Sequence, residues 1–94
     1  MKVRFWGVRG SIPAPGAHTA RYGGNSSCVE VRVEGGPSLV FDCGTGARAL
    51  GRKLLESRDK RALILFSHFH TDHVFGFPFF GPLYSPNCEV EVGV

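Results

Sequence analysis

Several features that define common classes of small protein are missing from this sequence. Its 94 residues include three cysteines, Cys28, Cys43 and Cys88, and none belongs to a CxxC pair. This pattern indicates neither a disulfide framework nor a zinc finger, and Cys28 and Cys43 are expected to be buried thiols. No apolar run approaches the roughly 18 residues of a membrane span, and no charged leader precedes an apolar segment. We therefore expect a cytoplasmic protein without a membrane partner.

A strong charge of one sign is also lacking. The formal net charge is +3, and the basic residues are spread along the chain with one small cluster at residues 58–61. A nucleic-acid footprint is normally a denser patch or stripe. The charge alone therefore indicates a mildly basic solvated surface that is compatible with an anionic substrate. Hydrophobic residues make up 43% of the chain, which suffices for a core, so residues 1–94 are expected to form a single domain.

Apolar patterning predicts an α/β fold. Strict alternation at residues 27–34, followed by Gly35 and Gly36, predicts a β-hairpin over residues 27–42. Helical spacing at residues 47–58 places Ala47, Leu50, Leu54 and Leu55 on the inner face. The continuous apolar run at residues 62–67 is typical of a strand buried on both faces. The predicted elements are strands at 2–9, 27–34 and 38–42, a helix at 47–58, a strand at 62–67, an irregular apolar segment at 74–84 and a strand at 88–94, with a long loop at 10–25.

The stretch SHFHTDH, residues 67–73, contains three of the four histidines. Side chains at i and i+2 of an extended backbone share a face, so His68 and His70 can reach one ion. Asp72 is expected to continue that face, and a turn would bring His73 beside it. Imidazole and carboxylate ligands suit Zn²⁺, Mn²⁺ or Fe. A lone histidine is usually a packed residue, but four candidate ligands in six positions predict two adjacent metal sites.

These residues resemble a known family. HFHTDH is similar to the HxHxDH motif of the metallo-β-lactamase superfamily, and FDCGTG, residues 41–46, is similar to its DxGTG-like turn. Residues 5–16 and 21–31 resemble the branch that contains phosphodiesterases and ribonuclease Z. The resemblance covers residues 3–92. It implies the first αβ half of an αββα sandwich, in which the second half supplies further ligands to each metal.

The resemblance also implies roles for individual residues. His68 and His70 would bind the first metal, and Asp72 and His73 the second. Asp72 would act as the catalytic residue that orients the attacking hydroxide. Asp42 would hold the metal-binding loop through hydrogen bonds, although it could equally cap the turn before the helix. Two zinc ions are implied, with manganese or iron as alternatives.

Function and partners follow as expectations from the same resemblance. We expect a metal-dependent hydrolase that acts on a small-molecule or nucleotide phosphodiester, with nucleic acid left open as a partner. Arg9, Arg21 and Asn25 could meet an anionic group, whereas His18 is a lone loop histidine. The alternative is a non-catalytic metal-binding half-fold or an oligomerising module. The phenylalanine-rich segment at 74–84 and an open apolar sheet face predict a homo-oligomer such as a dimer, or pairing with a missing C-terminal half.

Overall fold

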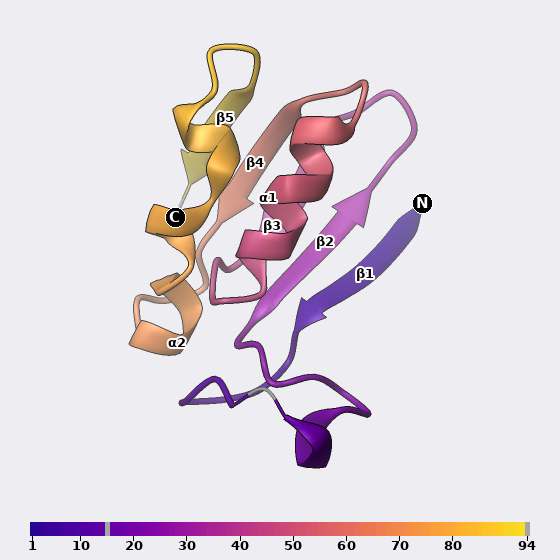
Figure 1. The fold of residues 1–94 in the computed structure, drawn as a ribbon. Helices are drawn as coiled ribbons and strands as arrows, with labels where there is room; N and C mark the ends of the chain where they lie inside the picture. The colour runs from indigo at the N-terminus through magenta and orange to yellow at the C-terminus, as the bar shows by residue number, and fades with distance from the viewer. Residues whose placement is uncertain (15, 94) are drawn as a thin grey trace.

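The structure is a computed structural model that describes residues 1–14 and 16–93. Five strands form one sheet in the order β1-β2-β3-β4-β5 (Figure 1). Pro15 of the predicted loop and Val94 of the predicted last strand lie outside the described residues. The elements are β1 (Lys2–Gly7), η1 (Ala17–Thr19), β2 (Cys28–Arg32), β3 (Ser38–Phe41), α1 (Ala47–Glu56), β4 (Arg61–Leu65), α2 (Thr71–Val74), η2 (Phe77–Phe79), η3 (Gly81–Tyr84) and β5 (Glu89–Gly93).

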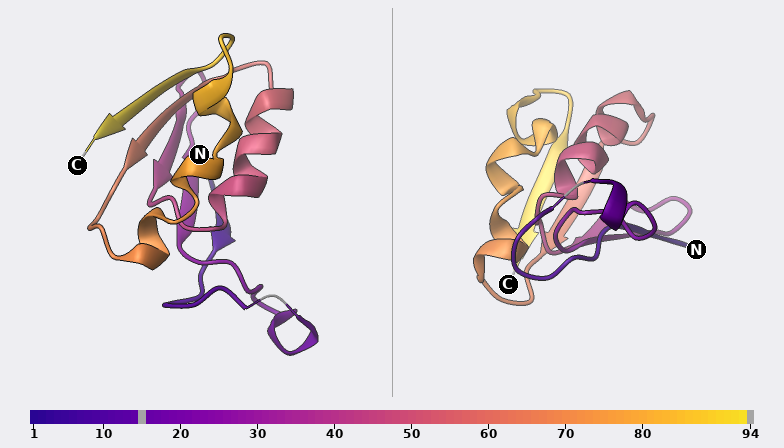
Figure 2. Two further views of the ribbon diagram at one scale, coloured as in Figure 1. Left: turned by 60° about the vertical axis from the view of Figure 1, so that its left-hand side comes forward. Right: turned by 60° about the horizontal axis from the view of Figure 1, so that its bottom comes forward.

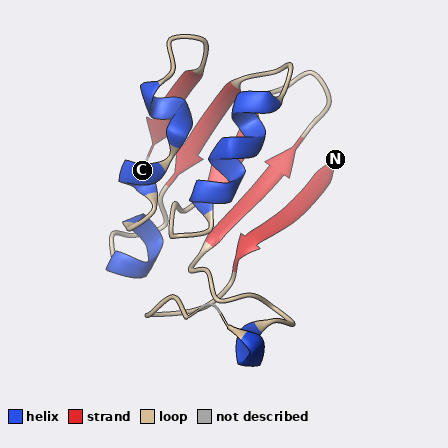
Figure 3. Cartoon of the chain, in the orientation of Figure 1, coloured by secondary structure: helices blue, strands red, loops and turns tan. Residues whose placement is uncertain are grey.

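The sheet is mixed. Strands β1, β2 and β3 are antiparallel, which confirms the predicted hairpin between β2 and β3, whereas β3, β4 and β5 are parallel. Helix α1 connects β3 to β4, as a parallel crossover requires. The carboxyl ends of β3 and β4 therefore meet at the same end of the sheet, where the long loop before β2 and the turn of α2 also lie (Figure 3). The predicted α/β class is confirmed.

One face of the sheet carries the core. Helix α1 and the 3₁₀ segments after α2 cover this face (Figure 2). The predicted inner residues Ala47, Leu50 and Leu54 are buried, but Leu55 is 38% exposed, so the predicted inner face of the helix is wrong at this position. Cys28 and Cys43 are buried as predicted, and burial raises the pKa of the Cys43 thiol to about 12. The buried apolar core is Cys28, Val40, Cys43, Ala47, Leu50, Leu54, Ala62, Ile64 and Phe80.

The other face of the sheet is open and apolar. Ala62 and Ile64 of β4 are buried under the helical layer, but Leu63 and Leu65 on the opposite face are only half-buried. The prediction that residues 62–67 are buried on both faces is therefore wrong for the described chain. The same face carries Phe5 on β1, which is 67% exposed. Apolar surface of this extent is typical of a contact surface.

A carboxylate lies on the helix-covered face, where the strand pattern alone would place an apolar residue. Glu30 of β2 is 1% exposed. It accepts hydrogen bonds from Trp6 Nε1 at 3.1 Å and from Ser38 Oγ at 2.7 Å, and Arg32 Nε lies 3.8 Å away. Buried polar atoms need such partners. The alternation at residues 27–34 is thus correct, but its polar face is the one that α1 covers.

None of the helices in the described ranges has the length and the apolar character of a membrane span.

Candidate metal centre

The histidine cluster lies where β4 ends. Ser67 and His68 follow the strand, and His70 is the residue before the first turn of α2, with φ −60° and ψ 147°. Asp72 and His73 belong to that turn, so Asp72 does not continue the extended face of His68 and His70. This part of the prediction is wrong, because the backbone becomes helical at Thr71. The predicted turn that brings His73 next to Asp72 is present.

The three imidazole rings of the cluster lie together. The ring centroids of His68 and His70 are 4.6 Å apart, and those of His68 and His73 are 4.0 Å apart. His73 Nε2 lies 3.4 Å from Asp72 Oδ2. His68 and His70 are exposed, whereas Asp72 and His73 are half-buried. The structure therefore gathers all four residues that the sequence selected.

A hydrogen-bond chain fixes the His68 ring. Ser67 Oγ donates to Asp42 Oδ2 at 2.7 Å and lies 2.9 Å from His68 Nδ1. Because the single hydroxyl proton of Ser67 goes to Asp42, Ser67 Oγ can only accept from the His68 ring. His68 therefore carries its proton on Nδ1 and presents the lone pair of Nε2. Carboxylates and hydroxyls that orient imidazole ligands act in this way at metal sites.

Asp42 is the buried anchor of this chain. It is 7% exposed, and its Oδ1 also accepts from the Ser67 N–H at 2.8 Å. Burial raises the pKa of Asp42, but the hydrogen bonds from Ser67 and the contact with His73 outweigh it, so the pKa lies below the usual range. The residue has a φ of 63°, a left-handed conformation that aspartate tolerates better than most side chains. The predicted role of Asp42 in holding the loop agrees with these contacts.

His73 packs against Asp42 without a well-aligned hydrogen bond. Its Nδ1 is buried and lies 2.9 Å from Asp42 Oδ2, within ion-pair distance. Within the described chain this nitrogen has no hydrogen-bond partner. At this distance the His73 ring and the Asp42 carboxylate are in direct contact, which lowers the pKa of Asp42. Asp42 thus supports two of the clustered histidines.

Asp72 is held by the long loop. Its Oδ2 accepts from the backbone N–H of Ser11 at 3.2 Å, and Ser11 has a φ of 67°. That hydrogen bond holds the pKa of Asp72 below its usual range, and the neighbouring His73 and His70 act in the same direction. Asp72 therefore stays ionised, and its Oδ1 makes no hydrogen bond within the described residues. Sequence reasoning missed Ser11 and Ser67, although Ser67 stands directly before His68.

Main-chain contacts between the CGTG turn and the end of α2 hold the histidine cluster in place. Cys43 N–H donates to His73 O at 2.8 Å, and Gly76 N–H donates to Cys43 O at 2.9 Å. A Cβ on Gly76 would lie 1.9 Å from Gly44 O, and one on Gly44 would lie 2.3 Å from Asp72 O. Glycine is therefore required at both positions by close approach of the two chain segments. The CGTG turn and the end of α2 are packed main chain against main chain.

The donor set fits a divalent transition metal. His68 presents a free Nε2, the His70 ring makes no hydrogen bond within the described chain, and Asp72 is ionised. Neutral imidazole with carboxylate is the donor chemistry that zinc, manganese and iron accept. Across residues 1–14 and 16–93, no three His, Cys, Asp or Glu side chains are arranged to hold one ion. The metal roles of His68, His70, Asp72 and His73 remain predictions.

The predicted anion-binding residues are divided between two hollows. Arg9 and Arg21 line a hollow of about 340 Å³ together with His18, and Arg9 Nε donates to Ile12 O at 2.7 Å. Asn25 lines another hollow, of about 430 Å³. The hollow that includes Asp72 and Ser11 has a volume of about 330 Å³ and contains none of these three residues. Their predicted role with an anionic group remains untested.

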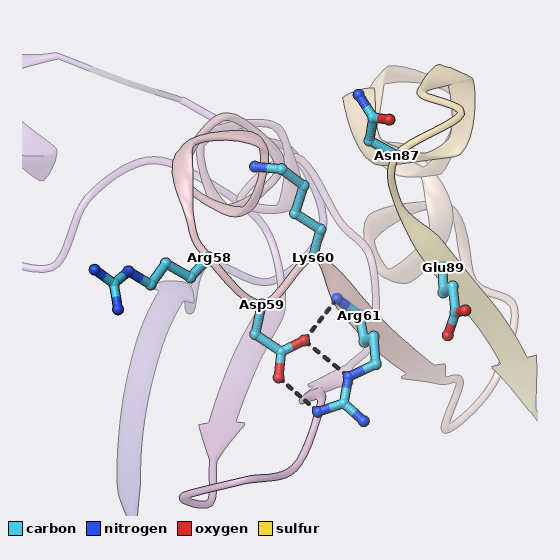
Figure 4. Close-up of a pocket in the computed structure, with 6 residues that line it drawn as sticks. All are labelled: Arg58, Asp59, Lys60, Arg61, Asn87 and Glu89. Carbon is cyan, nitrogen blue, oxygen red and sulfur yellow. Dashed lines mark hydrogen bonds and ion pairs between the residues drawn. The ribbon is translucent and has the colours of Figure 1, made fainter.

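A hollow of about 660 Å³ lies away from the histidines. Figure 4 shows its lining residues, which include the small basic cluster at residues 58–61. Arg61 Nη2 lies 2.7 Å from Asp59 Oδ2, and Lys60 Nζ donates to Ser57 O at 2.7 Å near the end of α1. These cations are engaged with the protein itself. We therefore place the candidate site at the histidine cluster despite its smaller volume.

A mixed sheet with helices on one face and a His/Asp cluster at strand ends defines an α/β protein with a candidate metal centre. Residues 21–86 match the model of the metallo-beta-lactamase superfamily. This match covers well over half of the described chain, and the chain belongs to that superfamily.

Two relatives support the same assignment. The chain is 33% identical to ribonuclease Z of Picrophilus torridus over 90 residues, which cover 96% of this chain and 26% of the relative. It is similar to the crystal structure of human tRNase Z, short form, with a TM-score of 0.59 and 34% identity, over 85% of this chain and 28% of that chain. The resemblance to the ribonuclease Z branch is confirmed, and the chain corresponds to a portion of that fold. The chain spans about a quarter of the length of these relatives.

Proposed function

We propose that this chain is part of a metal-dependent hydrolase that cleaves phosphodiester bonds of RNA or of a nucleotide. The observation that carries this proposal is the His/Asp cluster at the end of β4, in which Asp42 and Ser67 hold the His68 ring through its Nδ1 atom. The similarity to ribonuclease Z and tRNase Z supports RNA as the substrate class. The single domain and a cytoplasmic location remain part of this proposal.

The four residues of the cluster would have different roles at the metal site. His68 and His70 would hold one zinc ion, and Asp72 and His73 a second, with manganese or iron as alternatives. Bound in pairs, such ions supply Lewis acidity that activates water near neutral pH and polarises a phosphoryl oxygen. Asp72, ionised and anchored by Ser11 N–H, would orient the attacking water through its free Oδ1. With two ligands for each ion, further ligands would come from outside the described residues.

The first prediction concerns metal binding. Zinc is expected to bind the chain at neutral pH, and its affinity is expected to fall in acid, because only neutral imidazole can ligate. Elemental analysis after incubation with zinc or manganese, and calorimetric titration across pH, would measure both. Hydrolysis of bis-p-nitrophenyl phosphate distinguishes an enzyme from a binder. A chain without bound metal at neutral pH would refute the proposal.

A second candidate function is favoured by the open sheet face. Phe5 is 67% exposed and Phe41 is 41% exposed on this face, while Leu39 on the central strand β3 is half-buried. A surface of this kind is covered in stable assemblies. We propose that a second copy of the chain covers this face and forms a two-fold dimer. The dimer would be either a non-catalytic metal-binding module or a scaffold for the hydrolase.

The second prediction tests this association. Light scattering at micromolar concentration is expected to report a dimer or a larger species. Leu39→Lys should shift it to a monomer, because a charge would be placed in the middle of the contact. The matched control is Leu55→Lys on α1, where the leucine is 38% exposed on the other side of the molecule. A wild-type monomer that binds no apolar dye would show that the open face needs no cover.

A further inference from the structure

Two phenylalanine rings stand in solvent directly after the metal-binding turn. Phe75 is 52% exposed and Phe79 is 59% exposed, although Phe80 next to them is fully buried. The ring centroids are 6.3 Å apart and the ring planes differ by 34°. The segment therefore sends one ring into the core and presents two outward. Neighbouring exposed rings of this kind mark a contact surface rather than a packing need.

The two rings form one side of a hollow with a polar opposite side. The hollow has a volume of about 430 Å³ and is lined by Phe75, Gly76, Phe79, Asn25, Thr45 and Arg48. Its size falls within the range of small-molecule sites. Arg48 is exposed, and within the described chain its side chain makes no hydrogen bond or ion pair, so its guanidinium is available.

Asn25 and Phe75 indicate how a ligand would be oriented in this hollow. Asn25 Oδ1 accepts from Thr45 Oγ1 at 3.2 Å, which turns the amide N–H groups of Asn25 away from Thr45 and leaves them to donate. Phe75 also lines the neighbouring hollow that contains Asp72 and Ser11. The Phe75 ring therefore lines both the hollow that contains Asp72 and the hollow that contains Arg48.

We propose that this hollow seats a base of a single-stranded nucleic acid next to the bond to be cleaved. The base would stack on Phe79 and Phe75, Arg48 would pair with a phosphate, and Asn25 would donate to the base edge. Stacking on aromatic rings combined with a nearby arginine is how proteins bind single strands with little sequence preference. The inference rests on the proposed function, because it places the scissile phosphodiester at Asp72.

The mixed chemistry of the hollow favours a nucleotide over an apolar peptide. A peptide side chain would use the two rings but would leave Arg48 and the Asn25 amide without partners. A nucleotide uses all of them, because it joins a flat aromatic base to an anion. This complementarity needs no dense basic patch, which agrees with the modest net charge of +3.

The experiment measures binding without metal, so that it is independent of the metal proposal. Fluorescence anisotropy of a labelled oligoadenylate, in buffer with EDTA, would be compared between wild type and variants. Phe79→Ala is expected to weaken binding about 5- to 10-fold, the lower end of effects for one stacked base. Arg48→Gln is expected to weaken it and to lower the salt dependence by about one phosphate contact.

Matched controls and a second probe separate the outcomes. Arg58→Gln removes a cation at the far hollow and should not change affinity. An abasic oligonucleotide should bind wild type as weakly as oligoadenylate binds Phe79→Ala, and Phe79→Ala should not weaken it further. Phe79→Leu, which keeps the apolar volume, should behave like Phe79→Ala if stacking is the cause.

The possible results distinguish failure of the base-binding proposal from failure of the metal proposal. Equal affinity of wild type, Phe79→Ala and Phe79→Leu for oligoadenylate, with unchanged melting temperatures, would overturn the base platform. That result would leave zinc binding by the histidines untouched. Zinc binding that is absent while Phe79→Ala still weakens oligonucleotide binding would instead refute the metal-dependent hydrolase and retain a nucleic-acid-binding surface.

Discussion

Gly76→Ala is expected to destabilise the protein by at least about 2 kcal/mol, at the upper part of the range for overpacking substitutions. The new Cβ would lie 1.9 Å from Gly44 O and 2.7 Å from Gly44 C. Backbone atoms cannot rotate aside as a flexible side chain can, so the two turns must separate. Separation would break the hydrogen bonds from Gly76 N–H to Cys43 O and from Cys43 N–H to His73 O.

The same substitution is expected to weaken zinc binding, because His73 and Asp72 are carried by the displaced turn. Urea unfolding measures the change in stability, and calorimetric titration measures the change in zinc affinity. Gly10→Ala is the matched control, since a Cβ there meets no atom within 4 Å. A Gly76→Ala protein with wild-type stability and wild-type zinc affinity would mean that the main-chain contact does not position the cluster.

The elements that could be predicted are those that local chemistry determines. The hairpin of β2 and β3 follows from alternation and the Gly35-Gly36 turn, and α1 follows from the spacing of Ala47, Leu50 and Leu54. The clustering of the histidines was also predictable, because sequence proximity at a strand end leaves little freedom.

What could not be predicted depends on contacts between distant segments. Ser11 reaches Asp72 across 61 positions, and Ser67 reaches Asp42 across 25. Neither serine differs in sequence from an ordinary loop residue. The face of β2 that α1 covers was equally undetermined, because Glu30 is buried only through its partners Trp6 and Ser38. The helical start at Thr71, which moves Asp72 off the extended face, likewise reflects how the turn packs on Cys43.

His68→Ala and Asp42→Ala are expected to differ in degree at the metal centre. His68 is exposed, so its truncation leaves no cavity and should leave the fold intact while removing the Nε2 ligand. Phosphodiester hydrolysis by the zinc-loaded protein is expected to fall to background. Asp42→Ala removes an acceptor instead of a ligand, and losses at such positions are typically about 10- to 100-fold in metal affinity or activity.

The pH dependence of stability separates the two variants further. The pKa of Asp42 is lowered in the folded protein, so its carboxylate stabilises the fold above the unfolded value of about 3.9. This contribution is lost as the pH falls through the folded pKa. Asp42→Ala should therefore be less stable than wild type at neutral pH, with a difference that shrinks in acid, whereas His68→Ala should be as stable as wild type at neutral pH. Equal hydrolysis by wild type and His68→Ala under zinc saturation would show that His68 is not part of the metal site. An Asp42→Ala protein with undiminished zinc affinity would show that Ser67 alone orients the His68 ring.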